Sequence, residues 1–268
     1  RSFAGISKSP VDLDSEHYDH THHNCDVLIV GAGIAGLTAS LELAKTNKKI
    51  LLVDERPQLG GTSYEYPDDL VGETNQILHI KNIISQLEAH SNVTILSRTT
   101  AFAFHDENNV VANELRQDHL TPSVRNKKIS RQRLHKIKAK HVLLTTGASE
   151  RPIAFDNNDL PGIMLSSAGL SLLNKFSVLC GENVVIFTNN DSGYTTANYF
   201  AKYADNICLI DVRNKSSRVA LSSKVKLYSN SAIINANGKD SVKSVTISEL
   251  DSSSNLTDNR QTIVADAV

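Results

Sequence analysis

The residue pattern with the clearest chemistry is Gly31-Ala32-Gly33-Ile34-Ala35-Gly36, which has the spacing G-x-G-x-x-G. A short apolar run, residues 26–30, comes before it, and residues 34–46 follow with apolar side chains at helical spacing. A second apolar run covers residues 49–53. This order of strand, glycine loop, helix and strand is the context in which the motif binds a dinucleotide. We therefore expect a βαβ unit that holds a dinucleotide cofactor.

Each glycine of this loop has a separate role. Gly31 permits the tight turn, and Gly33 lets a pyrophosphate approach the backbone because it has no Cβ. Gly36 lets the helix and the strand pack closely. The helix N-terminus, around Ala35, offers unpaired N–H groups and a positive dipole end to the phosphates.

Two carboxylates follow the second strand and bear on the choice of cofactor. Asp54 lies where a carboxylate can accept hydrogen bonds from the adenosine ribose hydroxyls. Glu55 adds a second negative charge, and together they should repel the 2′-phosphate of NADP, whereas Arg56 acts in the opposite direction. The pattern favours NAD over NADP and leaves NAD against FAD open.

Two further short sequence segments are consistent with a dinucleotide site, although each is weaker evidence. Gly60-Gly61-Thr62 comes shortly after Asp54, and Thr145-Thr146-Gly147 ends an apolar strand before Arg151 and Pro152. In two-domain flavoprotein folds such strings line the same dinucleotide. No residue has the partners or spacing of a catalytic acid, base or nucleophile, so we expect none here.

Residues 184–213 repeat residues 27–56 without a gap. The repeat predicts a second βαβ unit, in which Asp211 and Arg213 correspond to Asp54 and Arg56. Its glycine loop is altered, because Thr188 stands for Gly31 and Asn190 for Gly33.

We expect this second loop to bind no nucleotide. Thr188 and Asn190 place side chains where a pyrophosphate must approach, and only the packing glycine survives, as Gly193. Asp191 is expected to cap the helix N–H groups and so fill the anion site. The alternative is that the amides of Asn189 and Asn190 bind phosphate themselves.

These elements predict an α/β fold with two Rossmann-like dinucleotide-binding units of the FAD/NAD(P)-binding, glutathione-reductase-like type. We expect a linker over residues 1–23 and an NAD-binding domain with an antiparallel β meander over 24–155. A degenerate Rossmann-like domain is expected over 156–264, and a truncated strand returning to the first domain over 265–268. Because residue 1 is Arg and the chain stops inside that strand, we expect a piece of a longer protein.

Composition narrows the possible partners and compartments. The formal net charge of -1 lacks the positive excess that is typical of nucleic-acid-binding proteins, and no apolar run is long enough to span a membrane. The 3 cysteines are far apart, without C-x-x-C, which suits a cytoplasmic protein and argues against a self-contained flavin disulfide reductase.

Two local clusters of polar residues could bind a metal or a partner. The histidines of residues 17–23 lack metal-ligand spacing, so we expect no metal. The basic stretch over residues 125–140 fits a half-exposed strand better than a partner surface.

Several strings resemble the alpha subunit of heterotetrameric sarcosine oxidase. They are Cys25 to Gly31, Leu52 to Arg56 with Gly60-Gly61-Thr62, Arg98-Thr99-Thr100, Thr146 to Pro152, Asn157 to Leu165, and Thr188 to Ser192. The resemblance covers nearly all of this chain but a minor part of that long subunit. It implies contacts with NAD⁺ at Ala35, Asp54, Glu55, Arg56, Thr62 and Ala101. With the glycine positions argued above, the expected cofactor-binding residues are Gly31, Gly33, Ala35, Gly36, Asp54, Glu55, Arg56, Gly61, Thr62, Ala101 and Gly147.

The resemblance also implies a hetero-oligomer with the other sarcosine oxidase subunits. FAD and FMN would lie elsewhere in that complex, which oxidises sarcosine to glycine and reduces O₂ to H₂O₂. Tetrahydrofolate would take up the one-carbon unit at a domain absent here, so we expect this chain alone to be inactive. The alternatives are a non-catalytic nucleotide-binding scaffold and a component of an amine or opine dehydrogenase.

Overall fold

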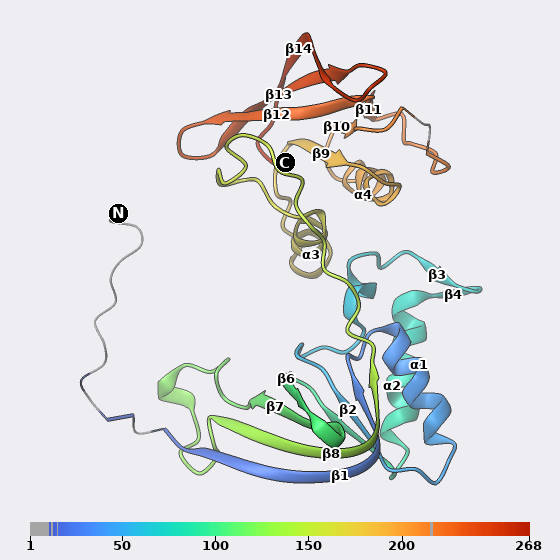
Figure 1. Ribbon diagram of the computed structural model, residues 1–268, viewed down its shortest axis with the longest axis vertical. Helices are drawn as coiled ribbons and strands as arrows, with labels where there is room; N and C mark the ends of the chain where they lie inside the picture. The colour runs from blue at the N-terminus through green and yellow to red at the C-terminus, as the bar shows by residue number, and fades with distance from the viewer. Residues whose placement is uncertain (1–10, 12, 15, 215–216) are drawn as a thin grey trace. The chain divides into compact units, whose positions relative to one another are not determined.

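The computed structural model describes residues 11, 13–14, 16–214 and 217–268 (Figure 1). The chain divides into two compact units. The first comprises the chain up to Ser63 together with Leu70–Gly147, and the second comprises Tyr64–Asp69 with Ala148–Val268. Each unit has its own sheets and its own core, so each is described separately.

The first unit is built on a six-stranded mixed sheet of order β5-β2-β1-β8-β7-β6. β1, β2, β5 and β8 are parallel, and the meander β6-β7-β8 is antiparallel, as the sequence predicted. The helices are α1 (Ile34–Ala44) and α2 (Gln76–Glu88). The strands of this sheet are β1 (Tyr18–Val30), β2 (Ile50–Val53), β5 (Val93–Leu96), β6 (Thr99–His105), β7 (Asn109–Leu115) and β8 (Gln132–Leu144). The short elements are η1 (Gly61–Tyr64), β3 (Leu70–Val71), β4 (Thr74–Asn75), η2 (Asp106–Asn108) and η3 (Pro122–Val124).

The central strands of this unit are buried on both faces, which explains their continuous apolar runs. On one face Ile29 and Leu52 pack with Leu37 of α1 and Ile80 of α2. On the other face the apolar residues of the meander complete a second cluster with Leu28. Side chains therefore cover both faces of the sheet along β1 and β2, at whose carboxyl ends the glycine loop lies.

The second unit repeats this plan with smaller sheets. Three parallel strands, in the order β11-β10-β9, carry α3 and α4 on one face, and an antiparallel sheet β12-β13-β14 covers the other. The predicted second βαβ unit is confirmed as β9, α4 and β10. The bounds are α3 (Ser166–Phe176), β9 (Asn183–Thr188), α4 (Ser192–Phe200), β10 (Asn206–Asp211), β11 (Val225–Ser229), β12 (Ser231–Gly238), β13 (Val242–Leu250) and β14 (Leu256–Val264).

Three expected boundaries differ from the structure. Of the range 1–23 expected to be a linker, residues 18–23 are strand, because β1 begins at Tyr18 and pairs with β8 from Gln132 onward. Residues 1–10, 12 and 15 of that range lie outside the described residues. The division between the units falls after Gly147, and Tyr64–Asp69 belongs to the second unit. The final residues, expected to be a strand of the first domain, pair within the second unit, where Ala267 lies opposite Val184 of β9.

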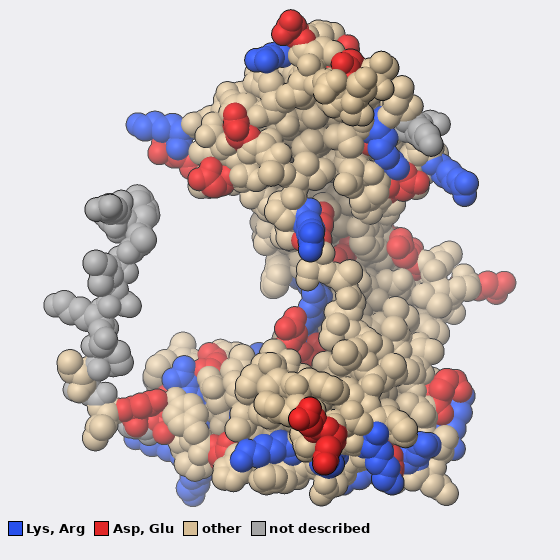
Figure 2. All heavy atoms as spheres, in the orientation of Figure 1, with Lys and Arg blue, Asp and Glu red and all other residues tan. Residues whose placement is uncertain are grey.

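Surface charge is balanced where the structure describes it. On the face shown in Figure 2, basic and acidic side chains are interspersed. The basic stretch of residues 125–140 is a half-exposed strand over Gln132–Lys140, as expected. Several of its cations form ion pairs, among them Arg131 with Asp118 at 2.6 Å and Arg133 with Asp19 at 2.7 Å. No helix among the described residues is long and apolar enough to cross a membrane.

Candidate functional site

The glycine loop joins β1 to α1 with the geometry that its residue types predict. Gly31 has a φ of +102°, and a Cβ on it would lie 2.4 Å from the Thr145 carbonyl oxygen. A Cβ on Gly36 would lie 1.9 Å from the Gly31 oxygen, so the close helix–strand approach requires glycine there. At Gly33 a Cβ would meet nothing within 4 Å. Packing therefore explains Gly31 and Gly36, whereas Gly33 borders open space that a ligand can use.

The N-terminus of α1 is unusual among the four α-helices of the described residues, because no protein acceptor caps it. Gly33 is its N-cap, makes no side-chain bond, and no acidic residue lies in the first turn. The other three helices have a side-chain acceptor at this end: Asn75 for α2, Glu150 for α3 and Asn190 for α4. Unpaired N–H groups at a helix start attract anions. The first turn of α1, which includes the exposed Ala35, can therefore hold a phosphate group.

Asp54 and Glu55 have different surroundings although they are adjacent. Asp54 is 9% exposed, and its carboxylate accepts hydrogen bonds from the Ala32 N–H at 2.6 Å and the Arg56 N–H at 2.8 Å. Glu55 is exposed. Asp54 thus fixes the glycine loop from below, and Glu55 is the carboxylate that is open to a ligand. The ribose contact predicted for Asp54 stays a prediction, because each of its carboxylate oxygens accepts one N–H and keeps a lone pair for a ligand hydroxyl.

The remaining expected residues lie around the same loop to different degrees. Gly60 donates its N–H to the Ala32 oxygen at 2.8 Å, which brings Gly61 and the exposed Thr62 beside Gly33. The Arg56 guanidinium donates to the Gly61 oxygen at 3.0 Å.

Gly147 and Ala101 are connected to the loop through their neighbours. Gly147 has a φ of +73° and follows Thr145, whose hydroxyl donates to the Gly31 oxygen at 2.7 Å. This side-chain role of Thr145 was missed from the sequence, where only its place in a short string was visible. Ala101 lies on β6, two residues after Thr99. The Thr99 N–H donates to the backbone oxygen of Asp54 at 2.8 Å. Ala101 pairs with Ala112 of β7, so its connection to the site rests on its strand position alone.

The second loop, between β9 and α4, is filled by its own side chains. The Thr188 hydroxyl donates to the Asn190 oxygen at 3.0 Å and accepts from the Asn190 N–H at 3.2 Å. The Asn190 side-chain oxygen accepts from the Ser192 N–H at 2.8 Å, and its amide donates to the Asn189 side chain at 3.0 Å. The helix start is therefore bonded internally, and the Asn190 amide group already has protein partners.

The expected capping role of Asp191 is wrong. Asp191 makes no cap hydrogen bond, and its carboxylate pairs instead with the Arg213 guanidinium at 2.9 Å. Arg213 also forms an ion pair with the fully buried Asp211 at 2.8 Å, and the Tyr194 hydroxyl donates to the Asp211 carboxylate at 2.9 Å. The capping prediction failed because Asp191 forms an ion pair with Arg213, which follows the next strand. Helix-capping rules do not include such tertiary contacts. Burial raises the pKa of Asp211, but these hydrogen bonds outweigh it and the pKa lies below its ordinary value.

Comparison with known proteins gives the family. Residues 25–268, which contain both βαβ units, match the model of the pyridine nucleotide-disulphide oxidoreductase family. The chain belongs to this family. This membership confirms the α/β fold of nucleotide-binding oxidoreductases that the sequence predicted. The cysteines Cys25, Cys180 and Cys208 are free thiols in the structure and form no C-x-x-C pair, so the family name does not imply disulfide chemistry in this chain.

This oxidoreductase chain is similar to the alpha subunit of sarcosine oxidase. It is 37% identical to that subunit from Corynebacterium sp. (strain U-96) over 94% of this chain and 27% of the relative. It is 32% identical to the one from Rhizobium meliloti (strain 1021) over 92% and 25%. The expected resemblance is thus confirmed, and the chain spans about a quarter of the length of these relatives. An opine oxidase subunit from Rhizobium meliloti (strain 1021) is 28% identical over 60% of this chain and 32% of the relative.

Solved structures confirm the fold of this oxidoreductase region. L-proline dehydrogenase from P. horikoshii superimposes with a TM-score of 0.65 at 21% identity, covering 96% of this chain and 43% of that chain. Thioredoxin reductase from T. acidophilum gives a TM-score of 0.65 at 17% identity, covering 91% and 75%. At these identities the likeness concerns the fold alone.

Proposed function

We propose that the first unit binds NAD on the loop Gly31–Gly36. The single observation that carries the proposal is the uncapped start of α1 beside the open Gly33. A pyrophosphate placed there would supply the acceptors that the protein does not. The exposed Glu55 would accept hydrogen bonds from the adenosine ribose, and the buried Asp54 would hold the Ala32 amide in position.

The choice of NAD over NADP rests on charge. Glu55 lies next to the buried carboxylate of Asp54, and the Arg56 guanidinium is directed to the Gly61 oxygen rather than left open for a 2′-phosphate. Isothermal titration against NAD, NADP and FAD tests this. We expect one NAD per chain and binding of NADP at least about ten-fold weaker, the equivalent of about 1.4 kcal/mol. Tighter binding of FAD, or of NADP, would contradict the cofactor assignment.

We propose further that this chain acts within a sarcosine oxidase alpha-type subunit of a hetero-oligomeric complex. The support is the similarity to named sarcosine oxidase alpha subunits over more than nine-tenths of the chain. In that role it would contribute to the oxidation of sarcosine, a CH–NH donor, with glycine and H₂O₂ as products. FAD, FMN and tetrahydrofolate would bind to parts of the complex outside these residues.

The isolated chain should not oxidise sarcosine, because none of its described loop residues forms a catalytic acid–base pair. Sarcosine-dependent peroxide release is the measurement, with the complete complex as the positive control. Release by the isolated chain at the rate of the complex would refute the proposal. If NAD in the complex is not reduced during turnover, its role is structural, which is the scaffold alternative.

A further inference from the structure

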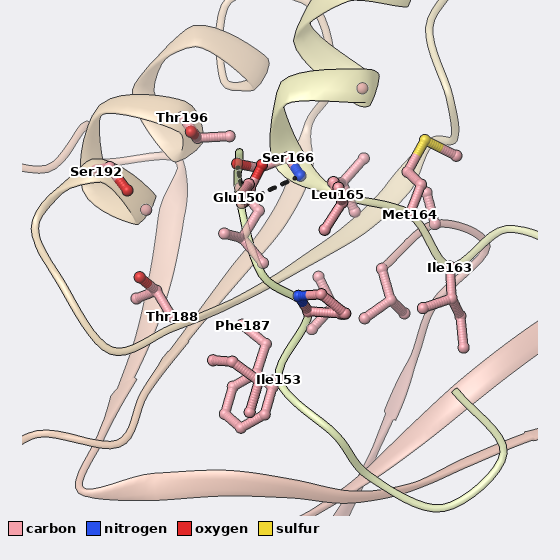
Figure 3. A pocket seen from close by; sticks show the side chains of 18 of the residues that line it. Glu150, Ile153, Ile163, Met164, Leu165, Ser166, Phe187, Thr188, Ser192 and Thr196 are labelled. Carbon is pink, nitrogen blue, oxygen red and sulfur yellow. Dashed lines mark hydrogen bonds between the residues drawn. The ribbon is translucent and has the colours of Figure 1, made fainter. Parts of the chain in front are cut away.

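A cavity of about 540 Å³ lies inside the second unit, along β9 and between α3 and α4 (Figure 3). Its volume is in the range of small-molecule sites. Figure 3 shows hydroxyl side chains of Thr188, Ser192 and Thr196 on one side and apolar side chains on the other, with Glu150 between them. The apolar wall includes Ile153, Phe155, Ile163, Met164, Leu165 and Phe187.

The two helix starts at this cavity are already satisfied. The Glu150 carboxylate accepts from the N–H groups of Ser166 at 3.3 Å and Ser167 at 2.9 Å, and from the Ser166 hydroxyl at 2.8 Å. Asn190 accepts from the Ser192 N–H at 2.8 Å. A phosphate would have to displace these acceptors, and it would face a carboxylate. The cavity therefore disfavours phosphorylated ligands, although it lies where the fold repeats its nucleotide loop.

Most other polar groups of the wall bond to one another. Thr188 and Asn190 exchange two hydrogen bonds, and the Ser192 hydroxyl donates to the Asn190 side chain at 2.6 Å. A wall with few unmatched donors or acceptors gains little from a polar ligand, whereas its apolar side gains from burying an apolar one. The body of a ligand should accordingly be apolar.

Charge then selects the polar end of the ligand. Glu150 and Arg151 are the charged residues that line the cavity. Glu150 is fixed by three hydrogen bonds, whereas no described residue holds the exposed Arg151 guanidinium. Burial raises the pKa of Glu150, but the bonds from Ser167 and Ser166 outweigh it, so the pKa lies below its ordinary value and the group is ionised at neutral pH. A fixed anion favours a cation because little ordering is needed on binding.

We propose that this cavity binds a small molecule with an apolar body and a primary or secondary amine, whose ammonium group lies at Glu150 and which carries no phosphate. This site is separate from the NAD site proposed for the first unit. It gives the second βαβ unit a binding role that replaces the lost nucleotide.

Two probes with the same fluorophore and opposite charge test the proposal on the full chain. Dansylcadaverine is a cation and dansylglycine an anion, and binding of each is followed by dansyl fluorescence. We expect dansylcadaverine to bind at least about ten-fold tighter, the scale of one charged hydrogen bond. Saturating ADP-ribose should leave its signal unchanged. Equal or tighter binding of dansylglycine, displacement by ADP-ribose, or a Kd for dansylcadaverine weaker than about 1 mM would overturn the proposal.

Variants locate the bound probe. Ile153→Trp fills the cavity from its apolar wall and should abolish binding, whereas Val264→Trp, at an exposed position of β14, should not change it. Glu150→Gln keeps an acceptor for the Ser167 N–H and should remove the preference for the cation. If Ile153→Trp does not fold by circular dichroism, Met164→Trp fills the same wall. Unchanged dansylcadaverine binding in a folded filling variant would place the probe elsewhere and refute the site.

Discussion

The two βαβ units follow the same backbone path and differ in what satisfies the start of the helix. In the first, α1 begins at an uncapped Gly33 that borders open space. In the second, α4 begins beside Asn190, whose side chain bonds the Ser192 N–H. The acids after the second strands also differ, since Asp54 supports the loop amide of Ala32 while Asp211 is gripped by Arg213. A repeated fold therefore does not imply a repeated ligand site, because a few side chains decide whether the helix N–H groups remain available.

Among the three glycine positions of the loop, the packing glycine is the one that both units keep, yet its surroundings differ. A Cβ on Gly36 would meet the Gly31 backbone oxygen at 1.9 Å, whereas a Cβ on Gly193 would meet the Thr188 side chain at 2.5 Å. Rotation of Thr188 moves its hydroxyl and methyl group but not its Cβ, so both contacts require a backbone shift, and the contact at Gly36 is the shorter of the two. The first unit is thus the less tolerant of substitution at this point.

The largest predicted effect is therefore on stability. Gly36→Ala should destabilise the first unit by about 3 kcal/mol, the upper end for overpacking, and Gly193→Ala should destabilise the second by about 1 kcal/mol. Urea unfolding followed by hydrogen exchange of each unit measures both. Adding Thr188→Gly should relieve most of the loss in Gly193→Ala. Equal losses for the two alanine variants would mean that the loops are packed alike.

The second prediction separates binding from folding. Gly33→Val should lower the free energy of unfolding by no more than about 1 kcal/mol, the scale of a poorer N-cap, because a Cβ there meets no atom within 4 Å, and should weaken NAD about 100-fold by filling the phosphate space. Asn190→Val is the matched change in the second loop. It should cost about 1 kcal/mol of stability as a lost cap and leave NAD affinity unaltered. Loss of NAD binding in Asn190→Val would show that the second loop holds nucleotide after all.

The sequence predicted the fold of both units and the location of the loop, and it did so for a physical reason. Apolar runs such as residues 50–53 are buried on both faces, and glycines such as Gly31 and Gly36 occupy positions that exclude a Cβ. Local composition encodes both features directly. The same holds for the repeat, because the sequence shows Thr188 and Asn190 at the positions of Gly31 and Gly33, the glycines proposed to serve a phosphate.

What the sequence could not predict depends on tertiary contacts. The strand over residues 18–23 is polar and lacks a core-like pattern, and it forms because β8 provides a long partner and ion pairs such as Asp19 with Arg133. The capping of α3 by Glu150 joins residues 16 and 17 positions apart in the chain. Likewise, only the structure distinguishes the buried Asp54 from the exposed Glu55.

The difference in burial between Asp54 and Glu55 gives the third prediction: substitution of Asp54 should affect stability, and substitution of Glu55 should affect cofactor binding. Asp54→Asn places an amide donor against the Ala32 or Arg56 N–H, so it should lower stability by about 1–2 kcal/mol. Glu55→Gln should leave stability unchanged, weaken NAD about ten-fold and reduce the preference over NADP. Thermal melts and titrations with both cofactors separate the two effects. If Glu55→Gln binds NAD like the unsubstituted chain, the ribose contact lies elsewhere.

The smallest predicted effect is a difference between the units in acid. In the first unit, the ring nitrogens of His23 and His135 lie 2.9 Å apart, and the other nitrogen of the buried His135 lies 3.0 Å from the Glu114 carboxylate. Burial, then the neighbouring His135, lowers the pKa of His23 below 6.5. The hydrogen bond with His135 lowers the pKa of Glu114 below 4.5.

Both shifts have the same sign for stability, because a group with a lowered pKa binds its proton more readily in the unfolded chain. Their contribution is complete above pH 6.5 and is lost as the pH falls through the folded pKa values of His23 and Glu114. In the second unit the buried Asp211 has its pKa lowered below 3.8, so its contribution persists to lower pH. Hydrogen exchange from pH 7 to pH 4, corrected for the intrinsic rate, should show the first unit losing protection before the second. His23→Gln should reduce that loss, and simultaneous loss in both units would show that the histidine pair does not set the acid sensitivity of the first.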